Sequence, residues 1–163
     1  MSKKTGKVGV VVHLDDYWNY TQSDRDIDIM QLYTETIKAL NADIFIIIDQ
    51  TEKGMVHKHN SLDIKCETYK SLPEALKKYS KFTKLYFEHS NALSEKKYTT
   101  LEKLKHPKSD CLYIFGSDIK GLNFSNIKLG KNDKIITIEV SKYILWTVVA
   151  TSLALYDRSI KQK

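Results

Sequence analysis

The sequence predicts an α/β fold, a mainly parallel sheet with helices on both faces, and three observations support that prediction. Short β-branched and apolar runs of strand length alternate along the chain with segments of helical periodicity. The runs are continuously apolar, as expected of strands that are buried on both faces. The length of 163 residues, with 42% hydrophobic residues, suits one domain over residues 1–163 with one sizeable core.

The first β-α-β unit is the clearest part of the pattern. Residues 7–13 contain the run Val-Gly-Val-Val-Val and predict a central strand. Asp26 can cap a helix through about Ala42, with an apolar face, and Asn41 suits its C-terminal end. Residues 43–49 form the next strand, and the unit has the right size for a right-handed crossover.

The remaining elements are expected in chain order. We predict strands over 62–69, 84–87, 110–115 and 134–140, a helix opening at Leu72-Pro73-Glu74, a short helix over 98–104 and a final helix over 141–158. Proline is tolerated at an early turn of a helix because its missing N–H would have no partner there. The final helix is apolar almost all the way round, which predicts burial on several sides, within the fold or against a second subunit.

Charge and composition limit the function classes. The net charge of +6 and a pI near 9.1 favour a polyanionic partner such as nucleic acid, although lysine used for solubility explains them equally well. The apolar run Val8 to Val12 is too short for a signal core or a membrane span, so we expect a soluble, cytoplasmic protein.

The cysteines and histidines give little support for a disulfide or a metal site. Cys66 and Cys111 lie far apart with no CxxC motif, which predicts reduced, partly buried thiols. His57 and His59 form an HxH motif near Cys66, but acidic ligands at a suitable spacing are missing. We therefore expect no metal.

The segment CLYIFGSDIKGL, residues 111–122, runs from a buried strand directly into a loop with a glycine at each end. Ligands of parallel sheets bind at this carboxyl end of the strands. A phosphate-binding P-loop would need Lys and then Ser or Thr after Gly121, where Leu122 and Asn123 stand. Two interpretations remain: backbone approaches a ligand at the bare Gly116, with Asp118 accepting hydrogen bonds, or a plain turn has positive φ at both glycines.

The same segment resembles the second motif of the SPOUT-class RNA methyltransferases. Residues 113–122, preceded by His106-Pro107, are similar to the strand, FG, small residue, acid and GL of the SpoU/TrmH branch. Residues 150–158 are similar to the close of the third motif, and Arg25 sits where the family has its first motif. The resemblance covers nearly the whole chain in order.

This resemblance implies both a fold and an activity. The sheet would end in a C-terminal trefoil knot that holds S-adenosylmethionine in a bent form, and the protein would be a homodimer paired through its last helix. The activity implied is S-adenosylmethionine-dependent 2′-O-ribose methylation of RNA, either tRNA or rRNA. Arg25 would be the catalytic residue that faces the methyl group, and the implied cofactor-binding residues are Phe115, Gly116, Asp118, Gly121, Ile138 and Leu145.

Three departures from the family pattern leave other functions open. Asp118 stands where Glu is usual, Ile144-Leu145-Trp146 replaces Ser-Leu-Asn, and the first-motif asparagine is missing unless Asn19 serves. The missing serine and asparagine are polar residues at the reaction centre of the family. The chain could therefore be a catalytically inactive SPOUT-like RNA-binding or assembly module, or a phosphate-sugar-binding α/β domain unrelated to methylation.

The candidate RNA-binding residues lie in two segments. Tyr17 and Trp18 share an aromatic loop near Arg25 where bases can stack, although packing over the pocket or across a dimer contact explains them equally well. Lys103 and Lys105 belong to the densest basic run, which is either an RNA track or a solvated helix face. Arg25 itself either holds an RNA phosphate and favours a developing alkoxide, or pairs with a neighbouring aspartate at a helix start.

Overall fold

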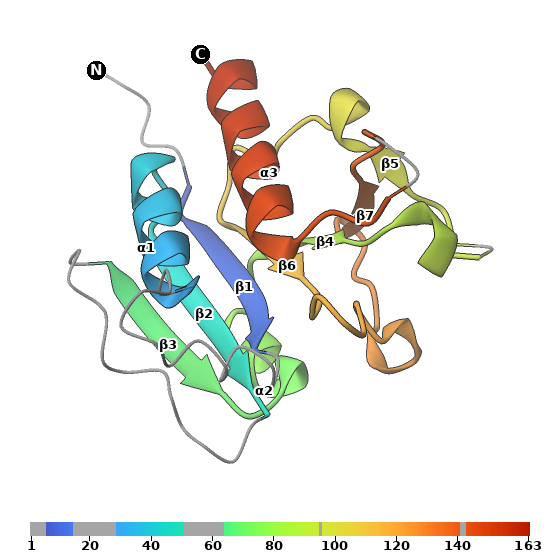
Figure 1. The fold of residues 1–163 in the computed structure, drawn as a ribbon, viewed down its shortest axis with the longest axis horizontal. Coiled ribbons are helices and arrows are strands. Elements are labelled where there is room, and N and C mark those ends of the chain that lie inside the picture. The colour runs from blue at the N-terminus through green and yellow to red at the C-terminus, as the bar shows by residue number, and fades with distance from the viewer. Residues whose placement is uncertain (1–5, 15–28, 51–63, 95, 141–142) are drawn as a thin grey trace.

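One parallel sheet organises the molecule. The structure, a computed structural model, describes residues 6–14, 29–50, 64–94, 96–140 and 143–163. Within these residues seven strands pair in the order β3-β2-β1-β6-β4-β7-β5, and every pairing is parallel (Figure 1). The strands are β1 (Val8–Leu14), β2 (Ile44–Asp49), β3 (Lys65–Tyr69), β4 (Thr83–Phe87), β5 (Thr99–Thr100), β6 (Cys111–Phe115) and β7 (Lys134–Thr137). The predicted α/β class and parallel sheet are confirmed.

Helices cover both faces of the sheet, as predicted. Helices α1 (Ile29–Ala39) and α3 (Thr147–Lys161) lie against one face, and α2 (Leu72–Lys78) lies against the other (Figure 1). Tyr33 of α1 and Leu155 of α3 are fully buried in the first core, and Ala75 of α2 is fully buried in the second. The sheet is therefore the middle layer of three.

Burial on both faces explains the unbroken apolar runs of the sequence. In β1, Val10 and Val12 point into the core beneath α1 and α3, while Val11 points into the core beneath α2. All three side chains are completely buried. Because neighbouring residues of a strand face opposite sides, a central strand of a three-layer protein has no position where a polar residue reaches water.

The end of α1 matches the sequence signal for it. Asn41 adopts φ 58°, the left-handed conformation that terminates many helices. The Ala42 N–H donates to Ile37 O at 3.0 Å and closes the last turn. The chain then enters β2 without a longer connection.

One predicted helix and two predicted boundaries were wrong. Residues 98–104 do not form a helix; β5 and a 3₁₀ turn, Leu101–Lys103, stand there, because Thr99 and Thr100 are β-branched and pair with β7. Strand β7 ends at Thr137, where its short partner β5 also ends. Helix α3 begins at Thr147 instead of residue 141, because Asp118 binds the N–H of Thr147 and fixes the first turn there.

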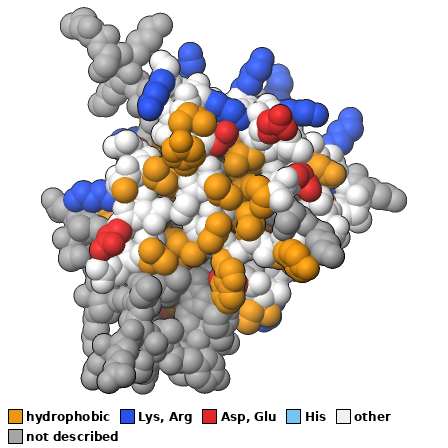
Figure 2. Space-filling view, turned by 45° about the horizontal axis from the view of Figure 1, so that its top comes forward, with side chains coloured by type: hydrophobic (Ala, Val, Ile, Leu, Met, Phe, Trp, Pro, Cys, Tyr) orange, Lys and Arg blue, Asp and Glu red, His pale blue; other side chains and the backbone are white. Residues whose placement is uncertain are grey.

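Within the single chain helix α3 has one buried side, and burial of its other sides against a second subunit stays a prediction. Thr151, Ala154 and Leu155 are buried against the sheet. Val149, Tyr156 and Ile160 on its outer side are 42%, 57% and 46% exposed. Figure 2 shows hydrophobic side chains gathered across the face of the molecule that carries α3. Among the helices that the structure describes, none is long and apolar enough to cross a membrane.

A polar network fastens the C-terminal half of α3 to the segment before β6. His106 Nε2 lies 2.8 Å from Asp157 Oδ2, and its Nδ1 lies 2.5 Å from the hydroxyl of Tyr113. Arg158 donates from Nη1 to Pro107 O at 2.8 Å. Burial lowers the pKa of His106, and Asp157 opposes the shift. The ring lies between Tyr113 and Asp157 and joins them through its two nitrogens. His106-Pro107, named in the sequence analysis, thus contacts Asp157 and Arg158 of α3 directly.

The two cysteines are free thiols, as predicted. Cys66 on β3 is half-buried and Cys111 on β6 is buried. Burial raises the pKa of both thiols, that of Cys111 to about 11. Neither environment is one that activates a thiolate.

Candidate functional site

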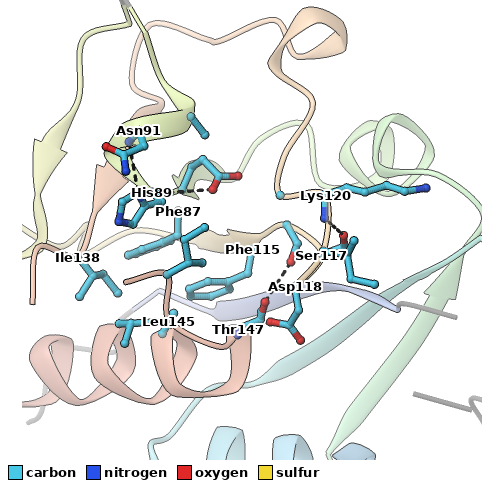
Figure 3. A pocket seen from close by; sticks show the side chains of 17 residues that line it. Phe87, His89, Asn91, Phe115, Ser117, Asp118, Lys120, Ile138, Leu145 and Thr147 are labelled. Atoms are coloured by element: carbon cyan, nitrogen blue, oxygen red, sulfur yellow. Dashed lines mark hydrogen bonds between the residues drawn. The ribbon is translucent and has the colours of Figure 1, made fainter. Parts of the chain in front are cut away.

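A pocket of about 340 Å³ lies at the carboxyl ends of β4, β6 and β7, beside the first turn of α3 (Figure 3). This is the edge of a parallel sheet at which ligands bind. All of the cofactor-binding positions implied by the sequence resemblance line it. They are Phe115, Gly116, Asp118, Gly121, Ile138 and Leu145.

The loop that follows β6 is folded back on itself. The Gly121 N–H donates to Ser117 O at 2.9 Å, and the Lys120 N–H donates to Ser117 Oγ at 2.8 Å. Gly121 has φ 63°, but Gly116 does not adopt positive φ, so the plain-turn interpretation holds for one glycine of the two.

Gly116 is bare because the loop's own backbone occupies the space beside it. A Cβ at Gly116 would overlap the main chain of Gly121 and Leu122. This contact gives a structural reason for glycine at position 116, and close approach of a ligand to its backbone stays a prediction. Gly116 permits the tight loop, and the loop in turn forms one wall of the pocket.

Glu88 holds this loop to the end of β4 by two hydrogen bonds, a role that the sequence analysis missed. Its Oε2 accepts a hydrogen bond from the Leu122 N–H at 2.6 Å, and its Oε1 accepts one from the His89 N–H at 2.8 Å. A Cβ at Gly121 would meet the Glu88 carboxylate. No local pattern reveals the contact, because the bonded residues are 34 positions apart.

Asp118 joins the loop to α3. Its Oδ1 accepts a hydrogen bond from the Thr147 N–H at 2.6 Å, and the Thr147 hydroxyl donates to Gly116 O at 3.2 Å. A carboxylate at a helix N-terminus compensates the unpaired N–H groups and the positive end of the helix dipole. Asp118 therefore fixes the position of α3 relative to the pocket.

The segment before α3 gives the pocket an apolar wall. Ile138, Ile144 and Leu145 line the pocket, and Trp146 is 62% exposed. Residues 144–146 consequently supply no polar side chain to the pocket, as their departure from the family pattern suggests.

The other predicted site residues lie apart from this pocket or outside the described residues. Arg25, Tyr17, Trp18 and Asn19 lie outside the described residues. Lys103 and Lys105 are exposed near the far end of α3, where Lys161 Nζ binds the carbonyls of residues 101 and 102. His57 and His59 also lie outside the described residues, and the described part of the chain has no cluster of three metal ligands.

A second pocket, of about 850 Å³, lies on the other side of the loop, beside α2 and the carboxyl ends of β1 and β2. It shares Ser117, Lys120 and Gly121 with the first pocket. Lys77 and Lys128 also contribute to its wall. Ligands in the two pockets would thus meet at one loop.

The fold is that of the SpoU/TrmH-class RNA methyltransferases. The chain is similar to the A. aeolicus TrmH/SpoU tRNA modifying enzyme, with a TM-score of 0.66 and 13% identity over 99% of this chain and 77% of that one. It is also similar to an AdoMet-bound rRNA methyltransferase from Sinorhizobium meliloti, with a TM-score of 0.61 and 12% identity. That match covers 96% of this chain and 57% of the other, so the chain spans little more than half of that protein.

A third solved structure concerns the 2-OH methylation of C/U34 on tRNA. It is similar with a TM-score of 0.66 and 14% identity, over 99% of this chain and 94% of that one. Neither a protein-family model nor a curated protein sequence matches the chain. The resemblance seen in the sequence is thus confirmed at the level of the fold.

Proposed function

We propose that this chain is an S-adenosylmethionine-dependent RNA 2′-O-ribose methyltransferase of the cytoplasm, acting on tRNA or rRNA as one domain over residues 1–163. One observation carries the proposal. The six positions implied for cofactor binding come from three separate segments of the chain and line one pocket in a fold shared with RNA methyltransferases.

The pocket suits the proposed cofactor in size and chemistry. A volume of about 340 Å³ falls within the range of small-molecule sites, which combine apolar walls with a few polar groups. Phe115, Ile138 and Leu145 supply the apolar walls, and Asp118 and Lys120 supply charges. S-adenosylmethionine, when bound, supplies a sulfonium methyl group that an oxygen nucleophile can displace. We further propose that the backbone around this pocket forms the trefoil knot implied by the resemblance.

The chain's own contribution to catalysis would be positioning and charge. A ribose hydroxyl must be held in line with the methyl group, and negative charge must be stabilised as its proton leaves. We assign that role to Arg25, which would hold the phosphate next to the target ribose. Arginine stays protonated in proteins, so it acts as a charge and a clamp and not as a base.

The second pocket offers a place for the RNA. Lys77, Lys120 and Lys128 line it, and lysine ammonium groups attract phosphates. Tyr17 and Trp18, which lie outside the described residues, would stack on bases of the RNA. Lys103 and Lys105 lie near the far end of α3, a helix of 15 residues and about 22 Å, so an RNA that touched both regions would have to extend over at least that distance.

We propose a homodimer paired through the outer side of α3. Val149, Tyr156 and Ile160 form an apolar stripe on that side, at spacings of seven and four residues. Contiguous exposed apolar surface of this kind marks interaction sites. A twofold axis through α3 would bury the stripe of one protomer against the same stripe of its partner.

One observation favours a second candidate, a catalytically inactive RNA-binding or assembly module. Residues 144–146 place no polar side chain in the pocket, although the family has a serine and an asparagine there. Such a module would retain RNA without transferring a methyl group. The two candidates therefore differ in one measurable step, the transfer of a methyl group to RNA.

Calorimetry with S-adenosylmethionine, followed by tritiated-methyl transfer to bulk RNA, tests the proposal. We expect micromolar binding that Ala150→Leu abolishes, because Ala150 of α3 lines the pocket and a larger side chain fills it. Ala39→Leu makes the same change at an exposed position of α1 and should bind as wild type. Absence of binding by the wild type refutes the proposal, and binding without transfer selects the second candidate. Unchanged transfer in Arg25→Ala removes Arg25 from the mechanism.

A further inference from the structure

The hydrogen bond that His89 makes with the backbone determines which of its ring nitrogens carries the proton. It directly follows Glu88 at the end of β4 and lines the first pocket. Its Nδ1 accepts a hydrogen bond from the Asn91 N–H at 3.2 Å and so caps the 3₁₀ turn Ser90–Ala92 (Figure 3). A ring nitrogen that accepts carries no proton, and the ring proton therefore resides on Nε2.

This Nε2–H group is buried and has no hydrogen-bond partner among the described residues. Buried polar groups in folded proteins are nearly always paired, and an exception calls for a specific explanation. Here the unpaired donor belongs to a side chain that lines a pocket. A ligand atom that accepts a hydrogen bond would remove the cost of leaving it unpaired.

The position of His89 in the pocket indicates which part of a ligand meets it. In Figure 3, His89 lies near Phe87 and Ile138, while Asp118 and Lys120 lie toward the opposite side. Apolar walls with one donor suit a flat heteroaromatic ring that has a nitrogen acceptor. The charged side suits the amino and carboxylate groups of an amino acid.

We propose that His89 Nε2–H donates a hydrogen bond to a purine ring nitrogen of the bound adenosyl ligand and fixes its base at the β4 end of the pocket. The proposal rests on the proposed function, since it takes an adenosyl compound as the ligand. It assigns His89 a binding role that neither the motif resemblance nor the sequence pattern contains.

Two substitutions separate the donor from the cap. In His89→Asn the shorter side chain can still accept from the Asn91 N–H, because asparagine is a good capping residue, but it places no donor at the Nε2 position. In His89→Gln the side-chain amide can reach the Nε2 position, while the cap is lost. Adenosine and S-adenosylhomocysteine are the probes, and calorimetry gives Kd for both.

We expect His89→Asn to weaken both ligands by roughly tenfold, the effect of one lost hydrogen bond, and His89→Gln to stay within about threefold of wild type. The same loss for adenosine, which lacks the amino-acid part, locates the contact at the nucleoside. On the wild type, one of 1-deaza-, 3-deaza- or 7-deazaadenosine should lose a similar factor. That analogue should lose nothing further in His89→Asn, because the contact is already absent.

The outcomes distinguish this inference from the proposed function. Binding by the wild type that is unchanged in His89→Asn, or insensitive to all three deaza analogues, overturns the role of His89 alone. Failure of the wild type to bind either probe overturns the adenosyl pocket itself and His89 with it. The deaza series uses the unmodified protein, so it decides the question even where a variant folds poorly.

Discussion

Replacing Asp118 should loosen α3 in a way that separates hydrogen bonding from charge. The Asp118 carboxylate takes the place of a helix cap, since Trp146 at the N-cap position makes no side-chain capping bond. Asp118→Ala removes both the acceptor and the charge. Asp118→Asn keeps an oxygen acceptor and removes only the charge.

The magnitudes follow from the geometry of this contact. Losing a capping acceptor costs about 1 kcal/mol, and losing a negative charge at a helix N-terminus costs about 0.3–1 kcal/mol more. The bond is partly buried and short, 2.6 Å, so the upper half of that range applies. For a chain of this length, 1 kcal/mol shifts Tm by about 2–4 °C. We expect a fall of about 3–8 °C for Asp118→Ala and about 1–4 °C for Asp118→Asn.

Calorimetric unfolding without ligand measures both shifts. Glu139→Ala and Glu139→Gln remove the same charge from an exposed side chain and control for the change in net charge. If Asp118→Ala unfolds within 1 °C of Glu139→Ala, the carboxylate does not hold α3. If Asp118→Asn loses as much as Asp118→Ala, charge and not the acceptor provides the stability.

Two further predictions concern regions outside the pocket. Burial would raise the pKa of Glu67, but hydrogen bonds from two lysines and two tyrosines lower it to about 2 from 4.5. Ionised Glu67 therefore stabilises the folded state fully above pH 4.5, and this contribution is lost as the pH falls toward 2. Urea unfolding between pH 5 and pH 2.5 should therefore show a smaller pH dependence in Glu67→Gln, and equal slopes would contradict the assignment. Tyr156→Glu should convert a dimer into an 18.9 kDa monomer in sedimentation experiments. Leu129 is also an exposed apolar side chain but lies outside α3, so Leu129→Glu should leave the dimer intact. A monomeric wild type excludes the dimer.

The strands could be predicted from the sequence because their burial leaves an unambiguous pattern. A strand covered on both faces is expected to form a continuous apolar run, and residues 8–12 and 44–48 show this directly, with His13 and Asp49 only near the carboxyl ends of β1 and β2. The end of α1 was equally readable, since Asn41 is one of the few residue types that tolerate its φ of 58°. The residues within each strand, and those at the end of α1, determine these features, so the sequence pattern alone was enough to predict them.

The pocket contacts could not be predicted, because they join residues distant in sequence. The Glu88 carboxylate reaches Leu122, and the Asp118 carboxylate reaches Thr147, which is 29 positions away. Neither pair shows a periodicity or a recognised spacing. The start of α3 was misplaced for the same reason: its first N–H group is capped from another segment instead of from the residues that precede it.

The contrast between Gly116 and Ala150 shows why a motif residue is a poor probe of its own pocket. Any side chain at Gly116 collides with the backbone of Gly121, so a substitution there opens the loop and moves Asp118 and the start of α3 with it. Lost binding in such a variant would report a disrupted loop as readily as a lost ligand contact. Ala150 projects into the pocket from a helix that tolerates leucine, so a substitution there changes the available space and leaves the loop bonds in place.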